Sequence, residues 1–196
     1  MRTETRTYTL YRITELSEEA KEKAYNQWLC NGYFYGWTHE NRQTLDAFCE
    51  RFGIVCRNWR YDACNYSYDY HSRQEDCIDG LSGWRLMAYL MNNHWNDLYM
   101  PKYFWKGMKG RKSRIFVDIC CPLTGYYIDD CILDPIYKFL KSPTENVTFD
   151  DLMNKCLDSF FRACRDDMES TQTLEYFTEE SNANGWEYLS DGKLFN

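Results

Sequence analysis

The sequence predicts an α+β fold in which a central antiparallel sheet, built on hairpins, is covered by amphipathic helices. Two runs rich in β-branched and aromatic residues, 115–121 and 126–132, flank Pro122-Leu123-Thr124-Gly125. Proline presets one turn dihedral and glycine allows a positive φ, so these four residues predict a hairpin connection. Apolar residues at helical spacing on either side predict the covering helices. A chain of 196 residues can bury a core without disulfides, and we expect a single domain over residues 1–196.

The N-terminal third predicts a strand followed by two helices. Residues 7–13 alternate as TYTLYRI, a pattern typical of an edge strand. Ser17 is a favourable N-cap, and the helix that follows it is expected to end at Asn31-Gly32. Thr38 is expected to cap a second helix, which is expected to end at Gly53.

A second predicted hairpin pairs residues 54–61 with residues 63–70. Tyr66, Tyr68 and Tyr70 recur at the strand period of two and therefore share one face. We interpret this face as a half-buried surface that packs on a helix, because aromatic residues favour such positions. The alternative is a platform on which a ligand stacks.

Two more helices are expected around the central hairpin. Residues 81–95 have a helical pattern that predicts the following residues on the buried side: Trp84, Met87, Leu90, Met91 and His94. Asp134-Pro135 is expected to begin a short helix through Leu140, and Ser142-Pro143 to end it.

The C-terminal part, residues 148–196, is predicted to be helical and acidic. Thr148-Phe149-Asp150-Asp151 fits a capping box, with aspartate in place of the commoner glutamate. The helix behind it has these residues as its expected buried side: Leu152, Cys156, Leu157, Phe160, Phe161 and Cys164. Residues 174–183 predict a further helix, and Asp191-Gly192 predicts the turn of a small hairpin.

The charge is unevenly distributed along the chain. The formal net charge is −7, and residues 148–196 alone hold 11 acidic and 4 basic residues. Asp151, Asp158 and Glu169 fall within one broad stripe of the predicted helices, where carboxylates can imitate the phosphates of a nucleic acid. The alternative is an ordinary solvated helix face.

Residues 101–114 are the strongest change in composition, with six basic residues, no acidic residue and two glycines. This composition predicts an exposed basic loop. Lysine and arginine neutralise phosphates while aromatic rings stack on bases. The candidate binding residues are Lys102, Trp105, Lys106, Lys109, Arg111, Lys112 and Arg114. The alternative to a nucleic-acid or nucleotide-binding loop is a solvated connector.

No catalytic motif is present. The sequence lacks the G-x-S-x-G, H-E-x-x-H and P-loop patterns and the dinucleotide-binding glycines. The cysteines lack the close pairs of zinc sites, and we interpret them as small buried hydrophobic residues. Four aspartates near the central hairpin suggest a Mg²⁺-dependent nuclease as an alternative to solvated strand ends: Asp118, Asp129, Asp130 and Asp134. We therefore expect no enzyme, no cofactor and no metal ligand.

The N-terminal residues contain no apolar run of the kind that signal peptides carry. We therefore expect a reduced, cytoplasmic setting in which the ten cysteines stay unpaired. No stretch approaches the length of a membrane span, so no membrane partner is expected.

Two motifs carry a resemblance. Residues 10–24, LYRITELSEEAKEKA, and the ending Ser190-Asp191-Gly192-Lys193-Leu194-Phe195 resemble uncharacterised proteins from phages and prophages of gut bacteria. The resemblance implies a small accessory protein of a mobile element in the cytoplasm of a bacterial host. That class includes inhibitors of bacterial defence systems, such as anti-CRISPR proteins.

Three function hypotheses follow. The first is a non-catalytic phage-type inhibitor or modulator that binds a host protein or nucleoprotein effector. The second is a nucleic-acid-binding module that uses the basic loop, which predicts binding that weakens steeply as salt rises. The third is a metal-dependent nuclease.

Overall fold

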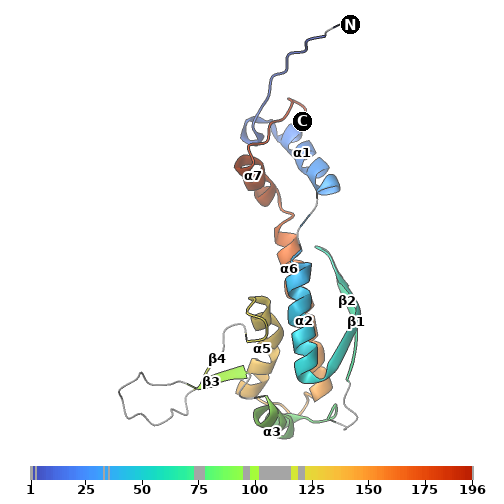
Figure 1. Ribbon diagram of the computed structural model, residues 1–196, viewed down its shortest axis with the longest axis vertical. Coiled ribbons are helices and arrows are strands. Elements are labelled where there is room, and N and C mark those ends of the chain that lie inside the picture. The colour runs from blue at the N-terminus through green and yellow to red at the C-terminus, as the bar shows by residue number, and fades with distance from the viewer. Residues whose placement is uncertain are drawn as a thin grey trace, which may run out of the picture. The chain divides into compact units, whose positions relative to one another are not determined.

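A computed structural model describes residues 2, 4–32, 34, 36–72, 78–94, 98–101, 116–118 and 122–195. The chain forms two compact units. Unit 1 comprises Met1–Gly36 and Asp166–Asn196, and unit 2 comprises Trp37–Arg165. The single domain expected over residues 1–196 stays a prediction. Helices and strands carry the labels of Figure 1.

Unit 1 is built on two helices, α1 (Glu18–Asn31) and α7 (Leu174–Ala183). Both begin as expected, because the Ser17 hydroxyl accepts the Ala20 N–H and the Thr173 hydroxyl accepts the Tyr176 N–H. The short 3₁₀ helix η1 (Ile13–Glu15) precedes α1. The buried apolar residues of this unit are Ile13, Leu16, Ala20, Ala24, Phe177 and Tyr188.

The edge strand expected at residues 7–13 is not formed. Only Tyr11 pairs, in an isolated antiparallel bridge with Tyr188, and the chain turns into η1 at Ile13. The expected C-terminal hairpin is reduced to a tight turn. Tyr188 and Leu194 make one bridge across it, and Gly192 takes a φ of 87° that disfavours any side chain.

Unit 2 contains the hairpin of β1 (Ile54–Tyr61) and β2 (Tyr66–Ser72), which confirms the predicted pairing, although the second strand was expected at residues 63–70. The strands are antiparallel, with Ile54 opposite Ser72 and Tyr61 opposite Tyr66. The Asp62 carboxylate accepts the backbone N–H groups of Cys64 and Asn65, both at 2.8 Å, and so fixes the turn.

The α+β class is confirmed, but the broad central sheet is wrong for the described residues. Residues 126–132 are not a strand. They lead into helix α5 (Ile128–Lys141), because Ile128, Ile132 and Ile136 recur at helical spacing and all face the core. From the first predicted run, Phe116–Asp118 forms the short strand β4, which pairs with β3 (Tyr99–Pro101).

Among the described residues, four helices and the β1–β2 hairpin enclose the core of unit 2. The helices are α2 (Thr38–Phe52), α3 (Gly83–Asn93), α5 and α6 (Phe149–Ser170), of which α6 belongs to unit 2 as far as Arg165. Figure 1 shows β1 and β2 running along α2 and α6. The largest fully buried side chains here are Phe48, Phe52, Phe149, Phe160 and Phe161, so the core is rich in rings.

Helix α2 ends at Gly53 as predicted, with the glycine at a φ of 64°. Its start differs from the prediction. Trp37 is the N-cap in a left-handed conformation, and no side chain caps the helix. Thr38, the expected cap, is the first helical residue.

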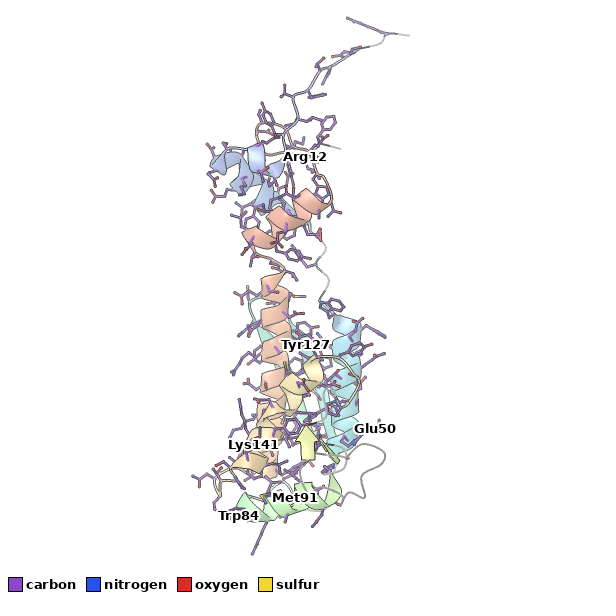
Figure 2. The ribbon with its side chains drawn as sticks, turned by 90° about the vertical axis from the view of Figure 1, so that its left-hand side faces the viewer. Arg12, Glu50, Trp84, Met91, Tyr127 and Lys141 are labelled. Atoms are coloured by element: carbon purple, nitrogen blue, oxygen red, sulfur yellow. The ribbon has the colours of Figure 1, made fainter. Side chains whose placement is uncertain are left out.

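The prediction of which residues of α3 are buried is partly wrong. Trp84 is 64% exposed and Met91 is 39% exposed, whereas Leu86 and Leu90 are fully buried. Figure 2 labels Trp84 and Met91 on this helix. The error arises because α3 has apolar residues around most of its circumference, so periodicity alone does not choose the face.

Helix α6 bears out the capping box and its predicted buried side. The Thr148 hydroxyl accepts the Asp151 N–H at 3.1 Å, while the Asp151 carboxylate accepts the Thr148 N–H at 3.0 Å. These hydrogen bonds lower the pKa of Asp151. All six residues of the predicted stripe are buried.

The three tyrosines of β2 pack on α6, which confirms the packing interpretation. The hydroxyl of Tyr66 donates to Asp158, that of Tyr68 to Asn154 and that of Tyr70 to Asp150. Two residues of a strand advance about 6.8 Å and four residues of a helix advance about 6 Å. Every second residue of β2 can therefore lie opposite every fourth residue of α6. The tyrosine face is therefore matched to one stripe of the helix.

The tyrosine face predicts a loss of stability at alkaline pH. Burial raises the pKa of Tyr68 to about 12, and burial together with Asp150 raises the pKa of Tyr70 further. Unfolded tyrosine titrates near pH 10, so this contribution is complete below about pH 10 and is lost as pH rises towards 12. We expect the urea midpoint to fall over that range. Tyr68→Phe should flatten the decline, and an unchanged slope in that variant would contradict the assignment.

A proline inside α5 is compensated from α6. Pro135 cannot donate the backbone N–H that would reach the carbonyl of Cys131 one turn earlier. The Ser159 hydroxyl donates to that carbonyl instead, at 2.8 Å. The expected helix start at Asp134-Pro135 is therefore wrong, because the lost hydrogen bond is replaced and the helix continues through the proline.

We expect Ser159→Ala to lower the free energy of unfolding by about 1–2 kcal/mol, since the hydrogen bond from Ser159 to the Cys131 carbonyl is lost. The decisive measurement is a double-mutant cycle with Pro135→Ala. An alanine at position 135 can supply the missing N–H, so the serine substitution should cost less in that background. Equal costs in both backgrounds would show that Ser159 does not replace the proline's missing donor.

Candidate functional site

The candidate functional site is an open pocket in unit 1, with a volume of about 330 Å³. Four aromatic side chains, Trp28, Phe177, Trp186 and Tyr188, line it. Gln27, Asn31 and Lys193 supply its polar lining. We call this site the aromatic pocket. Its size and its mostly apolar lining with few polar groups are typical of ligand sites.

Helices α1 and α7 position two of the rings. Trp28 follows Ala24 on the buried stripe of α1, and its ring lies 5.1 Å from that of Phe177 on α7. The ring of Phe34 meets Trp28 edge-on at 4.8 Å. The Tyr25 hydroxyl donates to the carbonyl of Gln172 at 2.6 Å. The ring of Trp28 is thus held between the ring of Phe34 and the buried ring of Phe177.

The C-terminal segment supplies the other two rings. Trp186 donates its backbone N–H to the Ser181 carbonyl at 3.0 Å, and the hydroxyls of Tyr188 and Ser181 lie 2.8 Å apart. Arg12, labelled in Figure 2, donates to the Gly185 carbonyl and pairs with Glu187 at 3.7 Å. Because these hydrogen bonds hold the backbone on both sides of Trp186, the pocket wall is preformed.

Gly192 is the residue that lets the C-terminal turn approach α1. A Cβ at this position would collide with the backbone carbonyl of Ala20. Only glycine combines that close approach with the positive φ of this turn. The turn therefore places Lys193 and Leu194 at the pocket.

All of the net charge lies in unit 1. Its residues include 13 acidic and 6 basic side chains, a formal net charge of −7, whereas unit 2 holds 17 of each. Three of the six basic residues form ion pairs with carboxylates: Arg6 with Glu4, Arg12 with Glu187 and Lys23 with Glu19. The aromatic pocket thus opens on a strongly anionic unit.

The predicted basic loop lies outside the described residues. This applies to every candidate in it: Lys102, Trp105, Lys106, Lys109, Arg111, Lys112 and Arg114. Nucleic-acid binding by this loop stays a prediction.

The predicted acidic face is placed residue by residue. Asp151 is held in the capping box with Thr148. Asp158 accepts from Tyr66 and pairs with Arg162 at 2.6 Å, so its charge is partly neutralised. Glu169 is exposed in the last turn of α6, within unit 1. Phosphate mimicry by these three residues stays a prediction.

Asp129, considered above as a magnesium ligand, has a structural role. It is 0% exposed, and its Oδ2 accepts three backbone N–H groups, from Leu123 at 2.9 Å, Thr124 at 2.7 Å and Gly125 at 3.0 Å. Its Oδ1 lies 2.9 Å from the hydroxyl of Thr44 and 2.8 Å from that of Thr124. The Pro122–Gly125 sequence is therefore a turn that leads into α5, held by this carboxylate.

Of the other three aspartates considered as magnesium ligands, Asp134 pairs with Lys138 at 2.6 Å and Asp130 is exposed. The side chain of Asp118 is outside the described part of the chain. Within the part of the chain that the structure describes, no group of three or more His, Cys, Asp or Glu side chains is placed to hold a metal ion.

A second hollow, of about 420 Å³, lies between α5 and α6. Lys138, Lys155 and Arg162 line it together with Asp134 and Asp158. Lys138 and Arg162 each form an ion pair with one of these aspartates at 2.6 Å. Since the charges largely cancel, this hollow offers less to an ionic ligand than the aromatic pocket does.

Burial makes two thiols poor nucleophiles. It raises the pKa of Cys56 to about 12, and it also raises the pKa of Cys156, which is fully buried. The thiolate is the reactive form, so neither cysteine is activated at neutral pH.

No family model, curated protein or solved structure matches the chain. In the described residues, no helix combines the length and the apolar character needed to span a bilayer.

The sequence reasoning missed the aromatic pocket. Trp28 lies in the first predicted helix and Trp186 precedes the turn predicted at Asp191-Gly192, and no local pattern joins these two residues. The available signal was the coincidence of aromatic residues near both ends of the chain, which becomes meaningful only when the two ends share a unit.

Proposed function

We propose that this protein is a non-catalytic inhibitor or modulator that binds a basic host protein through unit 1. The observation that carries the proposal is the concentration of the whole formal charge of −7 in the unit that also opens the aromatic pocket. A large single-sign field accelerates encounter with a partner of opposite charge and repels nucleic acid.

The environments of the carboxylates and thiols described above support binding over catalysis. Asp129 is saturated by internal donors, and Asp150 and Asp158 accept hydrogen bonds from strand tyrosines. The thiols of Cys56 and Cys156 have raised pKa values. Each of these groups is used to hold the fold or is kept protonated, whereas catalysis needs a group that is free to exchange protons or electrons.

The resemblance to phage and prophage proteins supports the target class. A basic groove that normally receives nucleic acid is the surface that an anionic phage protein would fit, and nucleases and nucleoprotein effectors of host defence carry such grooves. An anti-CRISPR protein acting in the bacterial cytoplasm is the most specific form of the proposal.

The proposal is tested with a panel of purified RNA-guided nucleases. We expect the protein to stop cleavage by at least one of them at equimolar concentration, with binding that weakens as salt rises. The variant Glu175→Gln/Glu179→Gln, which removes two exposed charges from α7, should bind more weakly. The matched control is Asp46→Asn/Glu50→Gln, which removes two exposed charges four residues apart from α2 in unit 2.

Three outcomes would overturn this proposal. If none of the nucleases is inhibited, the proposed target class is wrong. If cleavage stops at a small molar fraction of the protein, the protein acts as an enzyme on the nuclease. If the protein itself cuts nucleic acid with Mg²⁺, the nuclease hypothesis is favoured.

A further inference from the structure

We infer that the aromatic pocket binds an arginine side chain from a basic segment of the partner. This inference rests on the proposed function for the origin of that segment. The ring faces of Trp28 and Trp186 are electron-rich, and the planar, weakly hydrated guanidinium group stacks on such faces better than other cations do.

The polar lining fits a guanidinium. Asn31 donates its side-chain N–H to the backbone carbonyl of Gln27 at 3.0 Å, which orients the Asn31 amide group. The side-chain carbonyl oxygens of Asn31 and Gln27 are hydrogen-bond acceptors in the pocket lining, and arginine brings five N–H donors.

The net charge of unit 1 favours a cationic ligand over an anionic one. A nucleotide would also stack on indole rings, but its phosphates would enter a unit of net charge −7. Lys193 is the single basic residue of the pocket lining and also of residues 166–196. Its charge opposes a bound arginine and would favour a bound phosphate, so this residue distinguishes the two ligands.

The same chain already uses arginine against aromatic rings. In unit 2, the guanidinium of Arg42 lies 5.5 Å from the ring centre of Trp59, and that of Arg165 lies 5.8 Å from the ring centre of Tyr66. These distances are those of cation–π pairs. The aromatic pocket presents comparable rings without an arginine in its lining.

The test uses the full chain and three synthetic peptides that share one neutral backbone. The central residue is arginine, its uncharged analogue citrulline or glutamate. We expect the arginine peptide to shift the indole N–H signals of Trp28 and Trp186 saturably in NMR spectra. The citrulline peptide should bind about three- to tenfold more weakly, since it keeps the shape but loses the charge. The glutamate peptide should not bind.

Three variants assign the site. Lys193→Gln should bind the arginine peptide about two- to fivefold more tightly, because a like charge is removed from an exposed position. Trp186→Leu should lose at least about fivefold in affinity. Trp84→Leu, which removes an exposed indole in unit 2, is the matched control and should leave binding unchanged.

Several results would overturn the inference. Equal affinity for the citrulline and arginine peptides would show that the positive charge does not contribute to binding. Binding of the glutamate peptide or of AMP, weakened by Lys193→Gln, would identify an anion site. Absence of any shift with the arginine peptide would also reject the inference.

The outcomes of the peptide experiment and of the nuclease experiment are independent. If nucleases are inhibited but the arginine peptide does not bind, the inference about the pocket is wrong and the proposed function stands. If the peptide binds but no nuclease is inhibited, the pocket is an arginine site and the proposed target class is wrong.

Discussion

Replacing Asp129 with alanine is expected to lower the free energy of unfolding of unit 2 by at least about 3 kcal/mol. The substitution removes the acceptor of three backbone N–H groups, from Leu123, Thr124 and Gly125, and of the Thr44 hydroxyl. Each buried donor left without a partner costs about 1–3 kcal/mol. Urea unfolding followed by circular dichroism, with amide hydrogen exchange in α5, measures the loss.

Two further variants sharpen this prediction. Asp129→Asn should cost less than Asp129→Ala, because its carbonyl oxygen can still accept the three backbone N–H groups while its NH₂ group donates to the threonine hydroxyls. Asp130→Ala is the matched control, since it removes an exposed carboxylate from the same first turn of α5. It should cost less than about 1 kcal/mol. An Asp129→Ala variant as stable as the control would contradict the structural role given to this carboxylate.

Replacing Phe161 with alanine is the second large expected effect, at about 3–5 kcal/mol. This ring is 0% exposed. It stacks on Tyr68 at 4.9 Å and meets Phe160 edge-on at 5.0 Å. The substitution would leave a cavity under the tyrosine face, so the loss should include protection of the β1–β2 hairpin in hydrogen exchange.

The matched control is Phe195→Ala, which removes a ring that is 40% exposed in unit 1. It should change the hydrogen exchange of the hairpin little. Phe161→Leu should lose less than the alanine variant because it refills part of the cavity. If the alanine variant kept full protection of β1 and β2, the hairpin would not depend on this ring.

The two proposals for function use different properties of unit 1. The first depends on its net charge, which acts over distance and weakens with salt. The second depends on the geometry of four rings and three polar residues, which acts only in contact. A partner that is attracted by the charge and then anchored by an arginine would need both.

The sequence by itself determined the elements whose signals are local. Ser17 and Thr148 begin helices because their hydroxyls accept N–H groups three residues later. Gly53 ends α2 because it tolerates a left-handed conformation. The tyrosines of β2 follow the strand period, so their shared face and its packing on a helix were predictable.

The tertiary structure alone decided three features. Residues 128–132 became helical because a buried core accepts Ile128 and Ile132 on one helix face, and because Asp129 meets Thr44, 85 residues earlier. Pro135 stays inside α5 because Ser159, on another helix, replaces its hydrogen bond. Trp28 and Trp186 share a pocket because the two ends of the chain fold into one unit. Each depends on partners far apart in sequence, which local propensity and periodicity do not encode.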